Sequence, residues 1–140
     1  MENEINIESK NDKINPLVIA IDFDGTVVTH EYPNIGKDIG AVPVLKKFIE
    51  AGHHIILWTM RSGKELLEAQ NWFLENDIEL YGVNVNIDQR GWSNSPKCYA
   101  QIYIDDAALG APLTRDEALS DREFVDWETV EALLTVRKII

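Results

Sequence analysis

An apolar run that ends in two carboxylates and a glycine is the feature that most constrains this chain. Residues 17–21 read Leu-Val-Ile-Ala-Ile and are followed by Asp22, Phe23, Asp24 and Gly25. A short run of mostly β-branched residues predicts a strand buried on both faces, as in the middle of a parallel sheet. The two acids then lie at the carboxyl end of that strand, where open α/β sheets hold their ligands. The run therefore predicts an α/β fold with a site at this edge of the sheet.

The paired acids predict a bound cation. A turn needs only one Asp, whereas Asp22 and Asp24, two residues apart at a strand tip, repel each other unless a cation lies between them. Mg²⁺ is the expected ion. An EF-hand calcium loop also begins with alternating acids, but Thr26 and Pro33 stand where its third ligand and its glutamate are needed. Calcium binding of that kind is therefore excluded.

The length of 140 residues is that of one domain. We expect residues 16–140 to form this domain, and residues 1–15, which are mostly polar and rich in charged side chains, to be a flexible leader without signal-peptide features. No apolar run approaches the roughly 18 residues that a membrane-spanning helix needs. The single Cys98 cannot form an intramolecular disulfide, and such sparse thiol usage fits a reducing compartment. The sequence therefore predicts a cytoplasmic protein.

The charge of the chain argues against one class of partner. The net charge is −11, from 24 acidic and 13 basic residues. Such a charge opposes attraction to polyphosphate backbones, so nucleic acid is a poor candidate. A local site that holds a metal and a lysine still binds phosphate inside an acidic protein. A phosphorylated small molecule or protein therefore stays open as substrate.

Strands and helices are expected to alternate along the chain. Strands are predicted at residues 17–21, 54–59, 81–85 and 100–106. Helix starts are predicted at Pro43, at a capping box of Ser62 and Glu65, and at the N-cap Asp126. The alternation implies a three-layer, doubly wound, Rossmann-like fold with a mainly parallel sheet. The position of a fifth strand is left open because residues 107–123 carry mixed signals.

Side chains that can carry chemistry are expected at one place, the carboxyl ends of the strands: Asp22 and Asp24, Thr59, Lys97, and Asp105 with Asp106. In this order they resemble the motifs of the haloacid dehalogenase-like (HAD) superfamily, which are Asp-x-Asp-Gly-Thr, a Thr or Ser, a Lys, and an acidic pair. The resemblance covers about residues 17–108. The first motif is strongly specific, the acidic pair moderately so, and the single Thr and Lys are weak by themselves.

The resemblance implies a Mg²⁺-dependent phosphomonoesterase. In such an enzyme Asp22 attacks phosphorus and carries the phosphoryl group as an aspartyl phosphate, while Asp24 protonates the leaving oxygen and then activates water. Mg²⁺ is held by the Asp22 carboxylate, the Asp24 backbone carbonyl and Asp105. Asp106 is expected to be a water-mediated ligand, unless it exchanges roles with Asp105.

Three more residues are expected at the phosphate. The resemblance implies that Thr59 donates its hydroxyl to a phosphate oxygen and that Lys97 stabilises the charge developing on the phosphoryl group. Gly25 lets the backbone approach the ligand closely. Without the resemblance, a Thr that ends a strand is ordinary, and Lys97 after Pro96 is a solvated loop residue.

Roles are predicted for four other polar residues. Arg61 either touches the substrate or pairs with Glu65 on a helix surface. His30 and Tyr32 follow the first strand in a loop from which they can reach the site. His53 begins a strand at the end opposite to the acids, so a structural role is expected for it.

A cap domain, which many HAD proteins insert between these motifs, has no room in this chain. Residues 27–42 and 86–97 are predicted loops. The resemblance therefore points to the capless branch. An open site either admits bulky phosphorylated substrates or is closed by a neighbouring subunit in a homo-oligomer. Substrate specificity is expected to lie in residues 29–37 and 88–96.

Three other functions fit parts of the pattern. A haloacid dehalogenase in the literal sense needs neither metal nor proton shuttle, so Asp24 argues against it. A receiver-like domain also combines an acidic pair, a Thr, a Lys and Mg²⁺, but its phospho-accepting Asp follows a middle strand, and the corresponding residues 84–86 read Asn-Val-Asn. A non-catalytic module that binds metal or phosphate is the third, although every expected catalytic side chain is present.

Overall fold

The computed structural model describes residues 15–140 and contains a four-stranded parallel sheet. In spatial order the strands are β3 (Gly82–Val83), β2 (His54–Leu57), β1 (Val18–Ile21) and β4 (Ile102–Ile104). Val18 of β1 is paired with His54 of β2, and Ile19 with Ile102 of β4. The apolar run of the sequence is thus a central strand, as predicted. The predicted leader lies outside the described residues, apart from Asn15.

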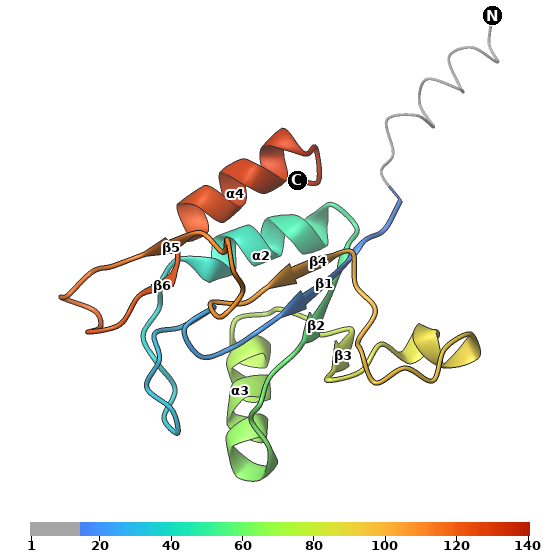
Figure 1. The fold of residues 1–140 in the computed structure, drawn as a ribbon, viewed down its shortest axis with the longest axis horizontal. Helices are drawn as coiled ribbons and strands as arrows, with labels where there is room; N and C mark the ends of the chain where they lie inside the picture. The colour runs from blue at the N-terminus through green and yellow to red at the C-terminus, as the bar shows by residue number, and fades with distance from the viewer. Residues whose placement is uncertain (1–14) are drawn as a thin grey trace, which may run out of the picture.

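Three α-helices pack on one face of the sheet: α2 (Ala41–Glu50), α3 (Gly63–Glu75) and α4 (Trp127–Val136). Ile19, Ile21, Ile55 and Leu57 share that face because side chains alternate along a strand, and they form one buried cluster with residues of all three helices. Right-handed connections from β1 to β2 and from β2 to β3 run in the same direction, which puts α2 and α3 on the same side. Figure 1 shows α4 beside α2.

Residues 84–101, which include the short 3₁₀ helix η1 (Ile87–Gly91), lie against part of the opposite face of the sheet, and η1 extends away from the strands in Figure 1. Tyr103 of β4 points to this face, and its hydroxyl donates a hydrogen bond to the Cys98 carbonyl. Asn86, Gln89 and Cys98 are buried there. Irregular backbone therefore occupies the layer that an α-helix fills in most doubly wound folds.

The α/β class and the mainly parallel sheet are confirmed, and within residues 15–140 no cap domain is inserted. Some local predictions were wrong. The strand expected at 81–85 ends at Val83, because Asn84 takes up a left-handed conformation with φ of 55°. The side chain of Ser62 makes no capping hydrogen bond to α3, so the capping box is absent. Asp126 does cap α4, since its carboxylate accepts from the Thr129 backbone N–H.

The mixed signals of residues 107–123 resolve into a ribbon outside the main sheet. Strands β5 (Leu113–Thr114) and β6 (Phe124–Val125) pair in antiparallel fashion. The Val125 N–H donates to the Gly25 carbonyl at 3.0 Å, and the Trp127 indole N–H donates to the Thr26 carbonyl at 2.7 Å. This ribbon therefore fixes the turn that follows β1.

His53 has the structural role expected of it. Its Nδ1 accepts from the Leu17 N–H at 2.9 Å, and its Nε2 lies 2.9 Å from the Ile139 carbonyl oxygen. The ring thus ties the start of β1 to the end of the chain. Among residues 15–140, no helix has the length and apolar character required to cross a bilayer.

In the loop after β1, the backbone of Gly36 lies directly against the backbone of Thr29. A Cβ at residue 36 would lie 1.8 Å from the Thr29 carbonyl oxygen. We predict that Gly36→Ala lowers the free energy of unfolding by about 1–3 kcal/mol, because the backbone must move to relieve this overlap. Gly91→Ala is the matched control, since its added carbon meets no atom within 4 Å. Urea unfolding measures both, and equal midpoints would contradict the prediction.

Candidate active site

Three carboxylates meet at the carboxyl ends of the central strand β1 and the neighbouring edge strand β4. Asp22 follows β1, and Asp105 and Asp106 follow β4. One oxygen atom from each lies within 4.8 Å of the others. The Asp22 N–H donates to the Ile104 carbonyl at 2.9 Å, which holds the two strand tips together. The structure therefore brings together three of the four acids predicted as metal ligands.

Thr26 holds these carboxylates in position. It is fully buried, its hydroxyl donates to Asp22 Oδ2 at 2.8 Å, and its Oγ1 accepts from the Asp106 N–H at 3.0 Å. The sequence reasoning gave Thr26 no role. The available signal was its place at the end of the Asp-x-Asp-Gly-Thr motif.

The environment of Asp22 favours a cation. Burial raises the pKa of Asp22 from 3.8 to about 7, and the negative charge of Asp105 adds to the increase, while the Thr26 hydroxyl lowers it. A divalent cation between the carboxylates would remove the repulsion. A set of carboxylate oxygens is what Mg²⁺ prefers. The cluster therefore fits the ion that the sequence predicted.

Gly25 serves a different purpose from the one predicted. Its φ is 78°, and a Cβ there would lie 2.5 Å from Asp106 Oδ2. Its N–H donates to the Val28 carbonyl at 2.9 Å. This donor is therefore occupied within the turn, and the close approach that Gly25 permits is that of Asp106.

Asp24 is held by Arg61. The Arg61 Nε donates to Asp24 Oδ2 at 2.8 Å, and Nη2 donates to Oδ1 at 2.7 Å. The other guanidinium N–H groups donate to the carbonyls of Pro33, Asn34 and Glu65 at 2.8–3.2 Å. One side chain thus joins the first motif, the loop after β1 and the first turn of α3. The carboxylate of Asp24 is not in the group of acids whose oxygens lie within 4.8 Å of one another, so a role as metal ligand is left to its backbone carbonyl.

The Arg61 guanidinium is enclosed as well as hydrogen-bonded. It is 3% exposed and lies between two aromatic rings, 5.0 Å from the centroid of Phe23 and 5.2 Å from that of Tyr32. The hydrogen bonds to Asp24 raise the pKa of Arg61. Neither predicted interpretation is correct, because all its donors are taken and its ion pair is with Asp24 rather than Glu65.

Thr59 lies between two adjoining cavities at this edge. One has a volume of about 560 Å³ and the other about 380 Å³, and Asp22, Thr59 and Asp105 line both. The Thr59 N–H donates to Asn84 Oδ1 at 2.8 Å, and its Oγ1 accepts from the Arg61 N–H at 3.1 Å. Within residues 15–140 its hydroxyl hydrogen has no acceptor, so it can serve a phosphate oxygen as predicted.

Lys97 is not brought to the acids. Its Nζ lies 5.6 Å from the centroid of the Tyr103 ring, and it lines neither cavity. The physical reason is that residues 84–101 run over the face of the sheet to which Tyr103 points. The distance of Lys97 from Asp105 along the chain does not reveal that path.

Polar side chains from two other segments also line the larger cavity. His30 and Tyr32 do so from the loop after β1, in agreement with the prediction that they can reach the site. Arg122, two residues before β6, also lines this cavity and was not among the site residues predicted from the sequence. Nothing in residues 107–123 pointed to a cation at the site.

Comparison with known proteins yields a structural relative. No protein-family model matches the sequence, and no curated protein does. The structure is similar to that of a conserved protein coded by a locus of Bacteroides thetaiotaomicron, with a TM-score of 0.72 and 33% sequence identity. The match covers 88% of this chain and 93% of the other. The chain therefore belongs to the same family as that protein.

The Arg61–Asp24 pair can be tested by a double-mutant cycle. We predict that Arg61→Met lowers the free energy of unfolding by about 3–5 kcal/mol, because it leaves a largely buried carboxylate uncompensated. Adding Asp24→Leu should recover part of that loss. The exposed pair of Lys47 and Glu131 is the matched control, and its removal should cost less than about 1 kcal/mol. Additive effects of the two changes at Arg61 and Asp24 would contradict the coupling.

The raised pKa of Asp22 predicts a pH dependence of stability in metal-free protein. The native state binds this proton more tightly than the unfolded state, so the free energy of unfolding should fall as pH rises from 3.8 to about 7. In the Asp22→Asn variant, the free energy of unfolding should change less with pH over this range. Urea titrations in EDTA at several pH values measure the effect, and parallel curves for the two proteins would refute it. Mg²⁺ should stabilise the wild type more at pH 8 than at pH 5.

Proposed function

We propose that the chain is a Mg²⁺-dependent phosphatase of the HAD type, which hydrolyses phosphomonoesters through an aspartyl phosphate on Asp22. The observation that carries the proposal is the cluster of Asp22, Asp105 and Asp106 at the strand ends, beside a cavity of about 560 Å³. These three residues would hold Mg²⁺. The bound ion would neutralise the cluster and orient the phosphate oxygens.

The first step is assigned to Asp22. With a pKa near 7, a substantial fraction of Asp22 is protonated at neutral pH unless a cation is close, so the nucleophilic carboxylate depends on the ion. Thr26 fixes Asp22 Oδ2, which leaves Oδ1 to attack phosphorus while the bond to the leaving oxygen breaks. The Thr59 hydroxyl would donate to a phosphoryl oxygen.

The proton transfers are assigned to Asp24, as the resemblance implies. Both its oxygens accept from Arg61, so Asp24 must turn away from Arg61 before it can donate a proton to the leaving oxygen. Each carboxylate oxygen has two lone pairs, so a paired Asp24 can still accept a hydrogen bond from the attacking water of the second step. The ion pair is therefore expected to open for the first step. The proposed role of Lys97 likewise requires its side chain to leave Tyr103.

A second function is favoured by these same two observations. With Asp24 paired to Arg61 and Lys97 over Tyr103, the acids and Thr59 form a metal and phosphate site that lacks its proton donor and its lysine. Such a site would bind phosphate without turnover. This corresponds to the non-catalytic or receiver-like module that the sequence left as the alternative.

The test is hydrolysis of p-nitrophenyl phosphate. We predict Mg²⁺-dependent turnover that EDTA removes and that Asp22→Asn reduces to background, because the nucleophile is lost. Glu75→Gln is the control, since Glu75 is exposed at the end of α3 and outside the cluster. Turnover that survives in Asp22→Asn would rule out Asp22 as the nucleophile. If the wild type is silent but calorimetry detects Mg²⁺ and phosphate binding, the binding module is the correct function.

A further inference from the structure

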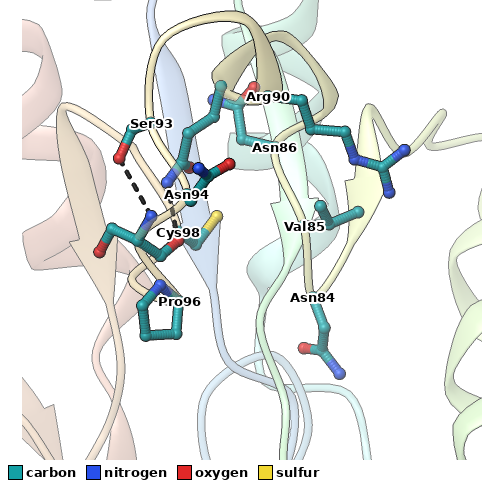
Figure 2. Close-up of a pocket in the computed structure, with 10 residues that line it drawn as sticks. Asn84, Val85, Asn86, Arg90, Ser93, Asn94, Pro96 and Cys98 are labelled. Atoms are coloured by element: carbon teal, nitrogen blue, oxygen red, sulfur yellow. Dashed lines mark hydrogen bonds between the residues drawn. The ribbon is translucent and has the colours of Figure 1, made fainter.

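A third cavity adjoins the acidic site and is not used by the mechanism above. It has a volume of about 290 Å³, close to the lower end of the roughly 300–1,000 Å³ usual for small-molecule sites. Figure 2 shows Asn84, Val85 and Arg90 along one side of it, with Ser93 and Asn94 across from them. Asn84 also lines the 380 Å³ cavity that contains Asp22 and Asp105. The two spaces therefore share a wall.

Buried amides hold this cavity in shape. Gln89 Nε2 donates to the carbonyls of Ser95 and Lys97, at 3.2 and 2.8 Å, and its Oε1 accepts from the Tyr99 N–H at 2.8 Å. Asn86 Nδ2 donates to the Tyr99 carbonyl at 2.9 Å. Gln89 and Asn86 are 7% and 4% exposed. Irregular backbone is thus fixed by side chains, so the cavity is formed before any ligand arrives.

The remaining polar groups of the lining are available to a ligand. Within residues 15–140 the side chain of Asn94 has no hydrogen-bond partner, and Asn84 uses only its Oδ1. The hydroxyl oxygens of Ser93 and Ser95 each accept a hydrogen bond from a backbone N–H, but neither hydroxyl donates to an acceptor in the described residues. Arg90 forms no salt bridge in the described part of the chain.

The chemistry of the lining selects one class of ligand. None of the ten lining residues carries a carboxylate, although the chain has a net charge of −11, and none is aromatic. A nucleobase would find no ring to stack on. Amides and hydroxyls both donate and accept, which matches the hydroxyl groups of a sugar or polyol.

We propose that this cavity binds the hydroxyl-bearing body of the substrate, so that the substrate is a small phosphorylated sugar or polyol. The inference rests on the proposed phosphatase function, with the phosphate at Asp22 and the body passing Asn84 into the cavity. Asn94 and Arg90 are then specificity residues. The proposed reaction at Asp22 is still hydrolysis of a phosphomonoester.

Kinetics provide the first test. Turnover of glycerol 3-phosphate, ribose 5-phosphate and glucose 6-phosphate is compared with that of p-nitrophenyl phosphate. For the best sugar or polyol phosphate, Asn94→Ala with Arg90→Ala should lower kcat/KM about tenfold relative to that for p-nitrophenyl phosphate, through KM. Asn71→Ala, an exposed amide on α3, should leave this ratio as it is. An unchanged ratio in the double variant would overturn the proposal.

Binding is followed separately by the amide resonances of ¹⁵N-labelled Asp22→Asn protein with Mg²⁺. At least one of the three phosphates should shift resonances of residues 89–98, whereas inorganic phosphate should shift only those near the acids, which include Asn84. The absence of shifts in 89–98 with all three, or equal shifts there with inorganic phosphate, overturns the proposal. Failure to hydrolyse any substrate, p-nitrophenyl phosphate included, overturns the proposed function instead, and the resonances still decide what the cavity binds.

Discussion

Repulsion between carboxylates is the constraint around which this site is built. Asp22, Asp105 and Asp106 converge within 4.8 Å because the tips of adjacent parallel strands must lie at one edge. Thr26 holds two of these acids by hydrogen bonds, to the Asp22 carboxylate and from the Asp106 backbone N–H. Gly25 leaves space for the Asp106 carboxylate because it has no side chain. Burial, together with the remaining repulsion from Asp105, raises the pKa of Asp22. A cation is the simplest way to relieve it.

Arg61 connects the acidic site to the loop after β1 and to α3. Asp24, which belongs to the same motif as Asp22, is outside the cluster, and its carboxylate is paired with Arg61. The same guanidinium bonds to the carbonyls of Pro33, Asn34 and Glu65, so the position of Asp24 depends on the loop after β1 and on α3. Release of Asp24 from Arg61 would therefore depend on the position of that loop. This links access to the cavity, which Tyr32 lines, with the proton chemistry proposed for Asp24.

Much of the fold could be read from the sequence because its signals are local. The apolar run at 17–21 predicted the central strand β1, the apolar residues before Asp105 predicted its neighbour β4, and Asp126 marked the start of α4. The prediction of a capping box at Ser62 was wrong. Residues 107–123 gave no clear signal, since a two-residue strand such as β5 has no measurable period.

For the site, the sequence by itself determined which acids meet, because parallel strands bring their carboxyl ends to one edge whatever surrounds them. Only the tertiary structure decided the partner of Asp24, the path of Lys97 and the arrival of Arg122. These depend on how segments distant in the chain pack, such as Arg61 against the loop after β1 and residues 84–101 across the far face of the sheet. Spacing along a chain carries no information on such paths.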